Sequence, residues 1–203
     1  MTGKQRLAEF LLNPEKYWNL LLSPLRARLL WLYDVQMGPG VGVIGKPLII
    51  NRGAGIRLGM GVRLYSAQSN HEIALPSRVV LTTRGEGRIE IGDHAMINGS
   101  TIRSFHRVTV GKNVWISSNC TIMDSHGHAL DPDTRLNKPD EHGEGAPVTI
   151  EDNVWMGIDC KVLPGVVIGK NSVISLGSMV TQNIPPNSLA AGVPAKVISK
   201  LTI

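Results

Sequence analysis

Aromatic residues are scarce in this chain, since Phe, Trp and Tyr together make up 4% of its 203 residues. Glycine, by contrast, occurs 22 times, and valine and isoleucine are plentiful. Few large rings and many small or β-branched side chains suit a narrow, repetitive β structure better than a helix bundle. At this length we expect one domain that buries a core of its own, with at most a small appendage.

Cysteine is also rare: Cys120 and Cys160 are the only two, and they form no C-x-x-C pair. Both lie in regular hydrophobic sequence, so we expect two buried, reduced thiols in a cytoplasmic protein. No apolar run approaches the ~18 residues that a membrane-spanning helix needs. The first residues also lack the basic, apolar and small-residue pattern of a signal peptide.

Blocks of one charge are absent, although 21 basic residues against 16 acidic ones give a net charge of +5. Without a Lys/Arg block or a basic stripe interleaved with aromatics, we expect no nucleic-acid partner. A basic balance also fits an anionic membrane surface or a small ligand rich in phosphate.

A six-residue repeat runs through the second half of the chain. From residue 150 an aliphatic residue returns at every sixth position, and a small or β-branched residue follows it four positions later. The first set is Ile150, Met156, Val162, Ile168, Ile174 and Val180, and the second is Val154, Cys160, Val166, Ser172, Ser178 and Ile184. The same frame is visible earlier at Ile44, Ile50, Ile56 and Val62, at Ile91 and Ile97, and at Val110, Ile116 and Ile122.

A period of six fits neither a helix nor a long alternating strand. It is typical of a parallel β-helix, in which each hexapeptide forms one flat face and three form one coil. The aliphatic residue then points inward, and Gly, Asn and Asp occupy corners that need a positive φ. We therefore predict an all-β domain, a parallel β-helix over residues 38–198, with a short tail at 199–203.

Residues 1–37 follow a different, Leu-rich pattern with helical spacing. The pairs Asn13-Pro14 and Ser23-Pro24 each resemble an N-cap followed by proline at the first helical position. We expect two or three short helices here, with an apolar side at Leu25, Leu29, Trp31 and Leu32 and with Arg26 and Arg28 outside. The apolar side would pack on the β-helix or on a neighbouring subunit. Alternatively, a basic amphipathic face would dock on an anionic membrane surface.

The repeat breaks between Ile122 and Ile150, which are 28 positions apart, 22 more than one repeat. Loops of this length are usually functional or disordered, so we expect the excursion over residues 123–148 to carry function. It contains three of the six histidines, His126, His128 and His142. A second irregular interval follows Val62 and includes His71, which we expect to be a surface histidine.

Three interpretations of the loop histidines compete. A zinc site would need three histidines with metal-ligand spacing, and the carbonic anhydrases built on parallel β-helices place two of them five residues apart on one strand. The histidines at 94, 126, 128 and 142 provide no such pair, so we expect no metal. A solvated histidine and a general base remain, because neutral imidazole can take a proton from an attacking hydroxyl. No Gly-x-Ser-x-Gly elbow or Cys/His pair indicates a covalent intermediate, which favours direct transfer.

Residues 89–198 resemble the hexapeptide-repeat acyltransferases, especially galactoside and maltose O-acetyltransferases and the O-acetyltransferases of surface-polysaccharide synthesis. The segments that carry the resemblance read "DSHGHALDP", "IEDNVWMG", "VLPGVVIG" and "GSMVTQNIPPNSLAAGVPAKVI". The resemblance implies a left-handed β-helix and a homotrimer with active sites between neighbouring subunits. It also implies acetyl-CoA as acyl donor, bound along the groove between two β-helices.

The family's loop histidine falls on His128, in "HALDP", where Ala129 replaces the usual proline. The resemblance implies that His128 is the general base, with His126 as the fallback. Asn98 stands at the position that hydrogen-bonds the acceptor in the family. Asp124, just before the loop, is expected from its charge and closeness to orient His128 or to hold a sugar hydroxyl.

The resemblance places the pantetheine arm of CoA along the backbone of Gly157, Leu176, Gly177 and Ser178, with Trp155 near the arm or the subunit interface. Thr181 and Lys196 fall on positions that contact the nucleotide end, where a cation suits a 3′-phosphate. Gln182 stands where the family usually has lysine, and Ile158 where a small polar residue is common.

The sequence thus predicts an acetyl-CoA-dependent O-acetyltransferase that acts on a sugar hydroxyl in polysaccharide or lipopolysaccharide assembly, in the cytoplasm or at the inner membrane face. N-acetyl transfer to an amino sugar or a xenobiotic amine is the alternative. A metal enzyme or a non-catalytic trimeric scaffold is the third hypothesis.

Overall fold

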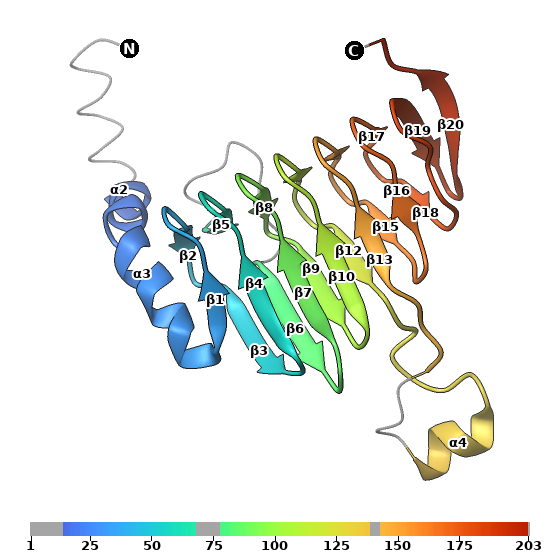
Figure 1. The fold of residues 1–203 in the computed structure, drawn as a ribbon, viewed down its shortest axis with the longest axis horizontal. Helices are drawn as coiled ribbons and strands as arrows, with labels where there is room; N and C mark the ends of the chain where they lie inside the picture. Colours follow the sequence, from blue (N-terminus) through green and yellow to red (C-terminus); the bar gives the residue numbers. More distant parts are fainter. Residues whose placement is uncertain (1–13, 68–77, 139–142, 203) are drawn as a thin grey trace.

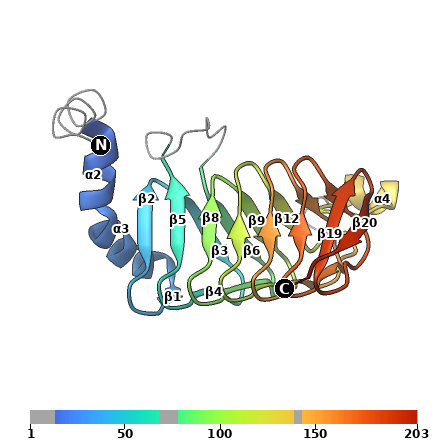
Figure 2. The same ribbon diagram turned by 90° about the horizontal axis from the view of Figure 1, so that it is seen from above.

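The computed structural model describes residues 14–67, 78–138 and 143–202. Within them the chain winds as a solenoid of short strands, whose coils follow one another along the long axis (Figure 1). Seen from above, the coils stand side by side from the N-terminal helices to the C-terminal hairpin (Figure 2). Every strand pairing in three sheets is parallel except the last, so the predicted parallel β-helix is confirmed.

Each sheet is one face of the solenoid and takes one strand from each successive coil. Sheet A consists of β1 (Val35–Met37), β4 (Gly55–Leu58), β7 (Arg88–Ile91), β10 (Arg107–Val110), β13 (Val148–Ile150) and β16 (Val167–Ile168). Sheet B consists of β2 (Gly42–Gly45), β5 (Arg63–Ser66), β8 (Met96–Asn98), β11 (Trp115–Ile116), β14 (Trp155–Met156), β17 (Val173–Ile174), β19 (Ser188–Gly192) and β20 (Ala195–Lys200). Sheet C consists of β3 (Leu48–Arg52), β6 (Val80–Arg84), β9 (Thr101–Ser104), β12 (Thr121–Met123), β15 (Lys161–Val162) and β18 (Met179–Val180).

The core is a set of columns in which each inward side chain stacks on its equivalent in the next coil. In sheet B, for example, Ile116 pairs with Met156, which pairs with Ile174, and all three are fully buried. Both sets of repeat positions between residues 150 and 184 are buried. The six-residue frame predicted for this half is therefore confirmed.

In the first coils the predicted frame is one residue out at Ile44 and Ile50, although Ile56 and Val62 are buried as expected. Val43 and Ile49, rather than Ile44 and Ile50, stand in register with the buried columns, because Val43 pairs with Leu64 and Ile49 with Leu81. Adjacent aliphatic residues offer two frames at each of these strands. Successive side chains of a strand point to opposite faces, so only one frame can fill the core.

A ladder of asparagines holds the corner between sheets A and B. Asn113, Asn153, Asn171 and Asn187 all have φ between 54° and 59°, in the left-handed region that asparagine tolerates better than most residues. Each side-chain amide donates to Oδ1 of the asparagine in the next coil, at 3.1, 2.9 and 2.8 Å along the series. In these four turns the asparagines thus supply both the backbone conformation and hydrogen-bond partners for one another's side chains.

The N-terminal helices cover the first coil of the solenoid (Figure 1). They are α2 (Pro14–Leu21), α3 (Ser23–Leu29) and the 3-10 helix η1 (Leu30–Tyr33). Ser23 Oγ accepts a hydrogen bond of 2.8 Å from Val43 N, which ties α3 to β2. The prediction of Ser23 as an N-cap is therefore wrong, because Leu22 is the cap residue and Ser23 begins the helix. Asn13 lies outside the described residues.

Few apolar side chains pack these helices against the β-helix: among their described residues, Ala27 and Leu30 are buried. The side chains expected on the apolar face, Leu25, Leu29, Trp31 and Leu32, are 47–65% exposed. Their predicted packing on the chain's own β-helix is therefore wrong, and contact with a neighbouring subunit or a membrane stays a prediction. Across the described part of the chain, no helix is both long enough and apolar enough to traverse a membrane.

The asparagine ladder predicts a graded loss of stability on substitution of Asn153. Asn153→Ala should lower the free energy of unfolding by about 2–3 kcal/mol. Alanine is strained at a positive φ, which asparagine tolerates better, and the substitution also removes two side-chain hydrogen bonds. Asn153→Gly should lose less, because glycine adopts this φ freely. Denaturant unfolding of both variants measures the difference. Equal losses would mean that the backbone conformation contributes little.

Candidate active site

The predicted excursion leaves sheet C after β12 and returns to sheet A at β13. Its base is closed by an antiparallel bridge between Ser125 and Gly145 and by a hydrogen bond of 2.9 Å from Ala146 N to Asp124 O. Beyond this closure the chain projects from the edge of the solenoid and forms α4 (Pro132–Asn137), as Figure 1 shows. The solenoid is therefore continuous below the loop, and the loop is an addition to one coil.

Helix α4 has the local signals of a capped helix. The carboxylate of Asp131 accepts a hydrogen bond of 2.7 Å from Thr134 N, with proline at the next position. Hydrogen bonds from Thr134 hold the pKa of Asp131 below its ordinary value. Arg135 donates to the carbonyls of Ala129 and Leu130, which folds the helix back on the strand that enters it.

The loop presents His126 and His128 to solvent, and His142 lies outside the described residues. The returning strand packs directly on the backbone of His128. A Cβ placed on Gly143 would lie 1.8 Å from the carbonyl oxygen of His128, so only glycine fits there. The position of the His128 backbone is thus fixed by contact with Gly143, while its imidazole is free to meet a ligand.

Asp124 is fully buried at the corner between sheets C and A. Its carboxylate accepts from Ser104 Oγ at 2.7 Å, from Phe105 N at 2.8 Å and from His106 N at 2.9 Å. All the side-chain hydrogen bonds described for Asp124 go to this corner, and none goes to His128. The carboxylate therefore anchors the coil below the loop, and a direct role toward His128 or a sugar hydroxyl stays a prediction.

On sheet B an apolar hollow of about 420 Å³ brings together three of the residues predicted to bind CoA, Trp155, Gly157 and Leu176. Trp155 and Leu176 are 52% and 74% exposed, and the indole Nε1 of Trp155 donates to Ser117 Oγ at 3.3 Å. The other lining residues are Ser117, Ile158, Val173, Ile174, Ser175 and Leu189. The lining residues come from four successive coils, those of β11, β14, β17 and β19.

The glycines and serine predicted beside this hollow contribute backbone rather than side chains. A Cβ on Gly157 would lie 2.6 Å from Leu176 N, so the coils approach more closely here than any other residue permits. Gly177 has φ of 69° and donates to Ile158 O at 2.7 Å. Ser178 is buried, and its hydroxyl donates to Ser175 O at 2.6 Å. Its side chain is therefore satisfied internally.

Thr181 and Lys196, predicted at the nucleotide end, are both exposed. Lys196 lies in β20, and its Nζ donates to Oε1 of Gln182 at 3.4 Å. Gln182, which replaces the family's usual lysine, thus lies beside Lys196, the cation predicted for the nucleotide end. Together they provide one charged and one neutral polar group at the C-terminal end of the solenoid.

Asn98 lies at the end of β8, where its Nδ2 donates to Ile116 O at 3.0 Å. Its Oδ1 is buried and has no hydrogen-bond partner among the described residues. A buried acceptor left unpaired costs about 1–3 kcal/mol. The contact of Asn98 with the acceptor stays a prediction.

Cys120 and Cys160 lie below the hollow, buried and unpaired, so the prediction of two buried free thiols is confirmed. Cys120 Sγ donates to Gly157 O at 3.1 Å, and Cys160 Sγ donates to Ser175 O at 3.2 Å. The hydrogen bond with Cys160, together with burial, raises the pKa of the Cys120 thiol. These thiols support the backbone that lines the hollow.

The loop and the hollow belong to different faces of the solenoid. The loop leaves at the corner between sheets C and A, whereas the hollow lies on sheet B. Three of the residues predicted to bind CoA therefore line one hollow, and the two loop histidines are not among its lining residues.

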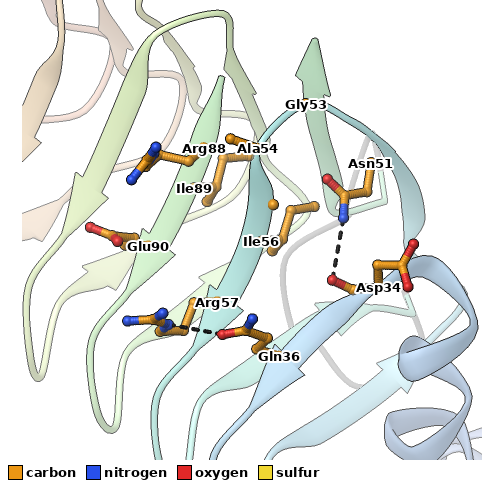
Figure 3. Close-up of a pocket in the computed structure, with 11 residues that line it drawn as sticks. Asp34, Gln36, Asn51, Gly53, Ala54, Ile56, Arg57, Arg88, Ile89 and Glu90 are labelled. Carbon is orange, nitrogen blue, oxygen red and sulfur yellow. Dashed lines mark hydrogen bonds between the residues drawn. The ribbon is translucent and has the colours of Figure 1, made fainter. Parts of the chain in front are cut away.

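Sequence reasoning missed Ser117, which hydrogen-bonds Trp155 and lines the hollow. The parallel register could have found it, because Ser117 follows Ile116, which pairs with Met156, and Gly157 is its equivalent one coil on. A second hollow of about 320 Å³ lies on sheet A, with Arg57 donating to Gln36 at 3.3 Å (Figure 3). None of the predicted site residues lines it. Among residues 14–67, 78–138 and 143–202, no group of three metal-ligating side chains is present.

Residues 147–182 match the family of bacterial transferase hexapeptide proteins, described as six repeats. The chain is 44% identical over 116 residues to the galactoside O-acetyltransferase of Escherichia coli, a match that spans 56% of this chain and 54% of that protein. A crystal structure of a hexapeptide-repeat acetyltransferase from Vibrio cholerae is 33% identical, with a TM-score of 0.52 over 57% of this chain and 64% of that one. A second structure of that protein, in complex with acetyl coenzyme A, has a TM-score of 0.50 over 57% of this chain and 61% of that one.

An N-acyltransferase from Bacillus cereus covers more of the fold: its TM-score is 0.68 over 88% of this chain and 89% of that one, at 18% identity. The predicted resemblance to hexapeptide-repeat acyltransferases, and with it the left-handed β-helix, is confirmed. The chain spans about half the length of the curated relatives it matches.

The burial of Asp124 predicts that its loss weakens the loop base. Asp124→Ala should lower the free energy of unfolding by about 2–5 kcal/mol, because it leaves the amides of Phe105 and His106 without their acceptor. Ser104→Ala, which removes one donor, should cost about 1 kcal/mol. The rate of limited proteolysis at Arg135 measures opening of the loop separately from unfolding of the whole chain. Cleavage of Asp124→Ala no faster than wild type would contradict an anchoring role.

Proposed function

We propose that the protein is an acetyl-CoA-dependent O-acetyltransferase that acts on a sugar hydroxyl. The observation that carries this proposal is the apolar hollow on sheet B, where Trp155, Gly157 and Leu176 stand together as the family motif requires. The E. coli relative is a galactoside O-acetyltransferase, and the V. cholerae relative is known in complex with acetyl coenzyme A. Both favour the same donor for this chain.

The residues of the hollow fit a pantetheine arm. The exposed side chains of Trp155 and Leu176 offer apolar contact, and closely spaced backbone at Gly157 and Gly177 offers amide and carbonyl groups. At the far end, Lys196 provides a cation for a phosphate. Because Gln182 is neutral, Lys196 carries the charge there alone among the residues predicted for this end.

The proposed reaction is direct transfer with His128 as general base. His128 takes the proton of the acceptor hydroxyl as its oxygen attacks the thioester carbonyl. A new ester bond forms, the carbon–sulfur bond breaks, and His128 returns the proton to the departing thiolate. Asn98 Oδ1, which lacks a partner among the described residues, is suited to accept a hydrogen bond from the acceptor. Gly143 fixes the backbone from which His128 acts.

A homotrimer completes this site. The loop leaves at the corner of sheets C and A, whereas the hollow lies on sheet B, so a neighbouring copy is proposed to bring its loop to this chain's hollow. Apolar side chains exposed on α2, α3 and η1, such as Trp18 and Trp31, are available for a neighbouring subunit or for the inner membrane face. The cytoplasm and its membrane face, where acetyl-CoA meets lipid-linked sugars, are the proposed location.

Transfer to an amine remains the alternative, because the same base and hollow serve either nucleophile. An acceptor panel of matched sugars and amino sugars, with thiol release as the readout, separates the two. Acetyl release only with amino sugars would overturn the choice of O-acetylation. If no acceptor in the panel caused thiol release and the protein also bound no CoA, only the scaffold hypothesis would remain.

The proposed base predicts a difference between two neighbouring histidines. His128→Ala should lower kcat by about 10²- to 10⁴-fold and leave the KM for acetyl-CoA unchanged. His126→Ala is the matched control, since it removes the same exposed ring two residues away, and it should keep most of the activity. Steady-state kinetics with one acceptor measure both. Equal losses, or a loss confined to His126→Ala, would sink the assignment.

The shared site predicts that two inactive variants restore each other. His128→Ala loses the base, and Leu176→Glu places a carboxylate in the hollow at a position exposed enough to keep the fold. Trimers assembled from both subunits then contain sites in which the intact loop meets the intact hollow. Activity should reappear on co-expression or after denaturation and joint refolding. No recovery in mixed oligomers verified by mass spectrometry would place both halves of the site within one chain.

A further inference from the structure

Two arginines on sheet C have no counter-charge among the residues that the structure describes. Arg84 is the last residue of β6, and Arg103 lies in β9 of the next coil. Both are partly buried, and the Nε atom of each is buried without a hydrogen-bond partner in the described chain. A buried donor that has lost its water and gained no acceptor costs about 1–3 kcal/mol, and more when it is charged.

The surroundings of Arg103 do not offset this cost. Its guanidinium lies over the ring of Phe105, with Cζ 4.7 Å from the centroid, but this contact leaves the buried Nε without a hydrogen-bond partner among the described residues. Burial, and then repulsion from Arg84, lowers the pKa of Arg103 below its ordinary value. The carboxylate of Asp124 is engaged by Ser104, Phe105 and His106. Neither arginine has an ion pair within the described ranges.

This pair of cations lies beside the segment that carries the proposed base. A Cβ placed on Gly127, between His126 and His128, would lie 3.7 Å from Nη1 of Arg103. The guanidinium therefore borders the first residues of the loop. A ligand whose hydroxyl reaches His128 passes close to Arg103.

We propose that Arg103, assisted by Arg84, binds an oxyanion carried by the acceptor, so that the substrate is a negatively charged sugar rather than a neutral one. This inference rests on the proposed acetyl transfer and names the substrate class for that site. A guanidinium presents paired donors that match the two oxygens of a phosphate or carboxylate. Two adjacent guanidiniums repel each other until such an anion lies between them.

The anion belongs to the acceptor and not to the donor. His128 must stand at the thioester carbonyl for the proposed reaction, and the whole pantetheine arm separates that carbonyl from the phosphates of CoA. The phosphates are placed at Lys196, at the C-terminal end of the solenoid. Arg103 lies at the opposite, reacting end, beside the loop.

Equilibrium binding to the intact protein saturated with CoA tests the proposal without depending on turnover. The probes are glucose 1-phosphate, glucuronate and methyl glucoside, which share a ring but carry a phosphate, a carboxylate and no charge. The wild type should bind at least one charged probe about tenfold to a hundredfold more tightly than methyl glucoside. Whichever charged probe binds more tightly identifies the oxyanion as phosphate or carboxylate.

Substitution assigns the preference to the arginines. Arg103→Gln should abolish it and leave the affinity for methyl glucoside unchanged, Arg84→Gln should reduce it, and Arg103→Lys should keep part of it. Arg88→Gln is the matched control, because it removes one positive charge from sheet A, where Figure 3 shows Arg88 beside the other hollow. It should leave all three affinities unchanged.

Two results would overturn the inference. One is equal affinity for charged and neutral probes in the wild type. The other is destabilisation of the trimer by Arg103→Gln. Removal of an unpaired cation should leave the thermal stability unchanged or raise it. A lower thermal stability would mean that Arg103 is paired across a subunit interface. Thiol release from acetyl-CoA is recorded in parallel. Its failure with every acceptor would reject the proposed activity, while the binding series still decides whether Arg103 holds an oxyanion.

Discussion

The parallel register between coils is the constraint on which the rest of this structure depends. Because strands pair in register with their equivalents one coil away, each side chain meets the same position of the next coil. Like therefore stacks on like, both inside and outside the solenoid. Inside, this gives continuous aliphatic columns such as Ile116, Met156 and Ile174. At the corners it gives the asparagine ladder, in which each amide is both donor and acceptor.

Stacking of like on like is favourable for apolar and amide side chains and unfavourable for charges. Asn113 and Asn153 gain a hydrogen bond from the arrangement, whereas Arg84 stands opposite Arg52, a residue of the same charge in the coil before it. A solenoid has few ways to separate two cations placed on adjacent coils of one face. Arg103 stands opposite Thr82 in the register, yet repulsion from Arg84 still contributes to lowering its pKa, so two positive charges lie close together beside the loop.

The repeated half of the molecule was predictable from sequence because each coil repeats the evidence of the one before. Val162 and Val180 are buried where the six-residue frame placed them. At the start of the chain, adjacent aliphatics such as Ile49 and Ile50 left two frames open, and only strand pairing selects between them. Ser23 looked like a helix cap, but its hydroxyl is used by Val43 N, a contact between segments far apart in sequence.

For the site, three predicted residues on regular coils lie together in the structure, whereas the contacts of those near the loop were not visible in the sequence. Trp155, Gly157 and Leu176 line one hollow because their spacing follows the repeat. Asp124 was expected to face the loop, yet the hydrogen bonds described for its carboxylate point into the corner, because three donors from the preceding coil lie within reach there. Arg103 drew no attention in the sequence, since nothing local indicates that a cation lacks a partner.

The contact between Gly143 and the backbone of His128 separates the loop into two regions with different freedom. Below the contact, the chain is tied to the solenoid through the Ser125–Gly145 bridge and cannot change length without moving the histidine. Beyond it, α4 forms no such bridge to the coils among the described residues. Insertions, deletions and substitutions can therefore accumulate in the outer loop while the imidazole keeps its place. A scaffold built this way can vary its outer loop during evolution while the backbone of His128 stays fixed against Gly143.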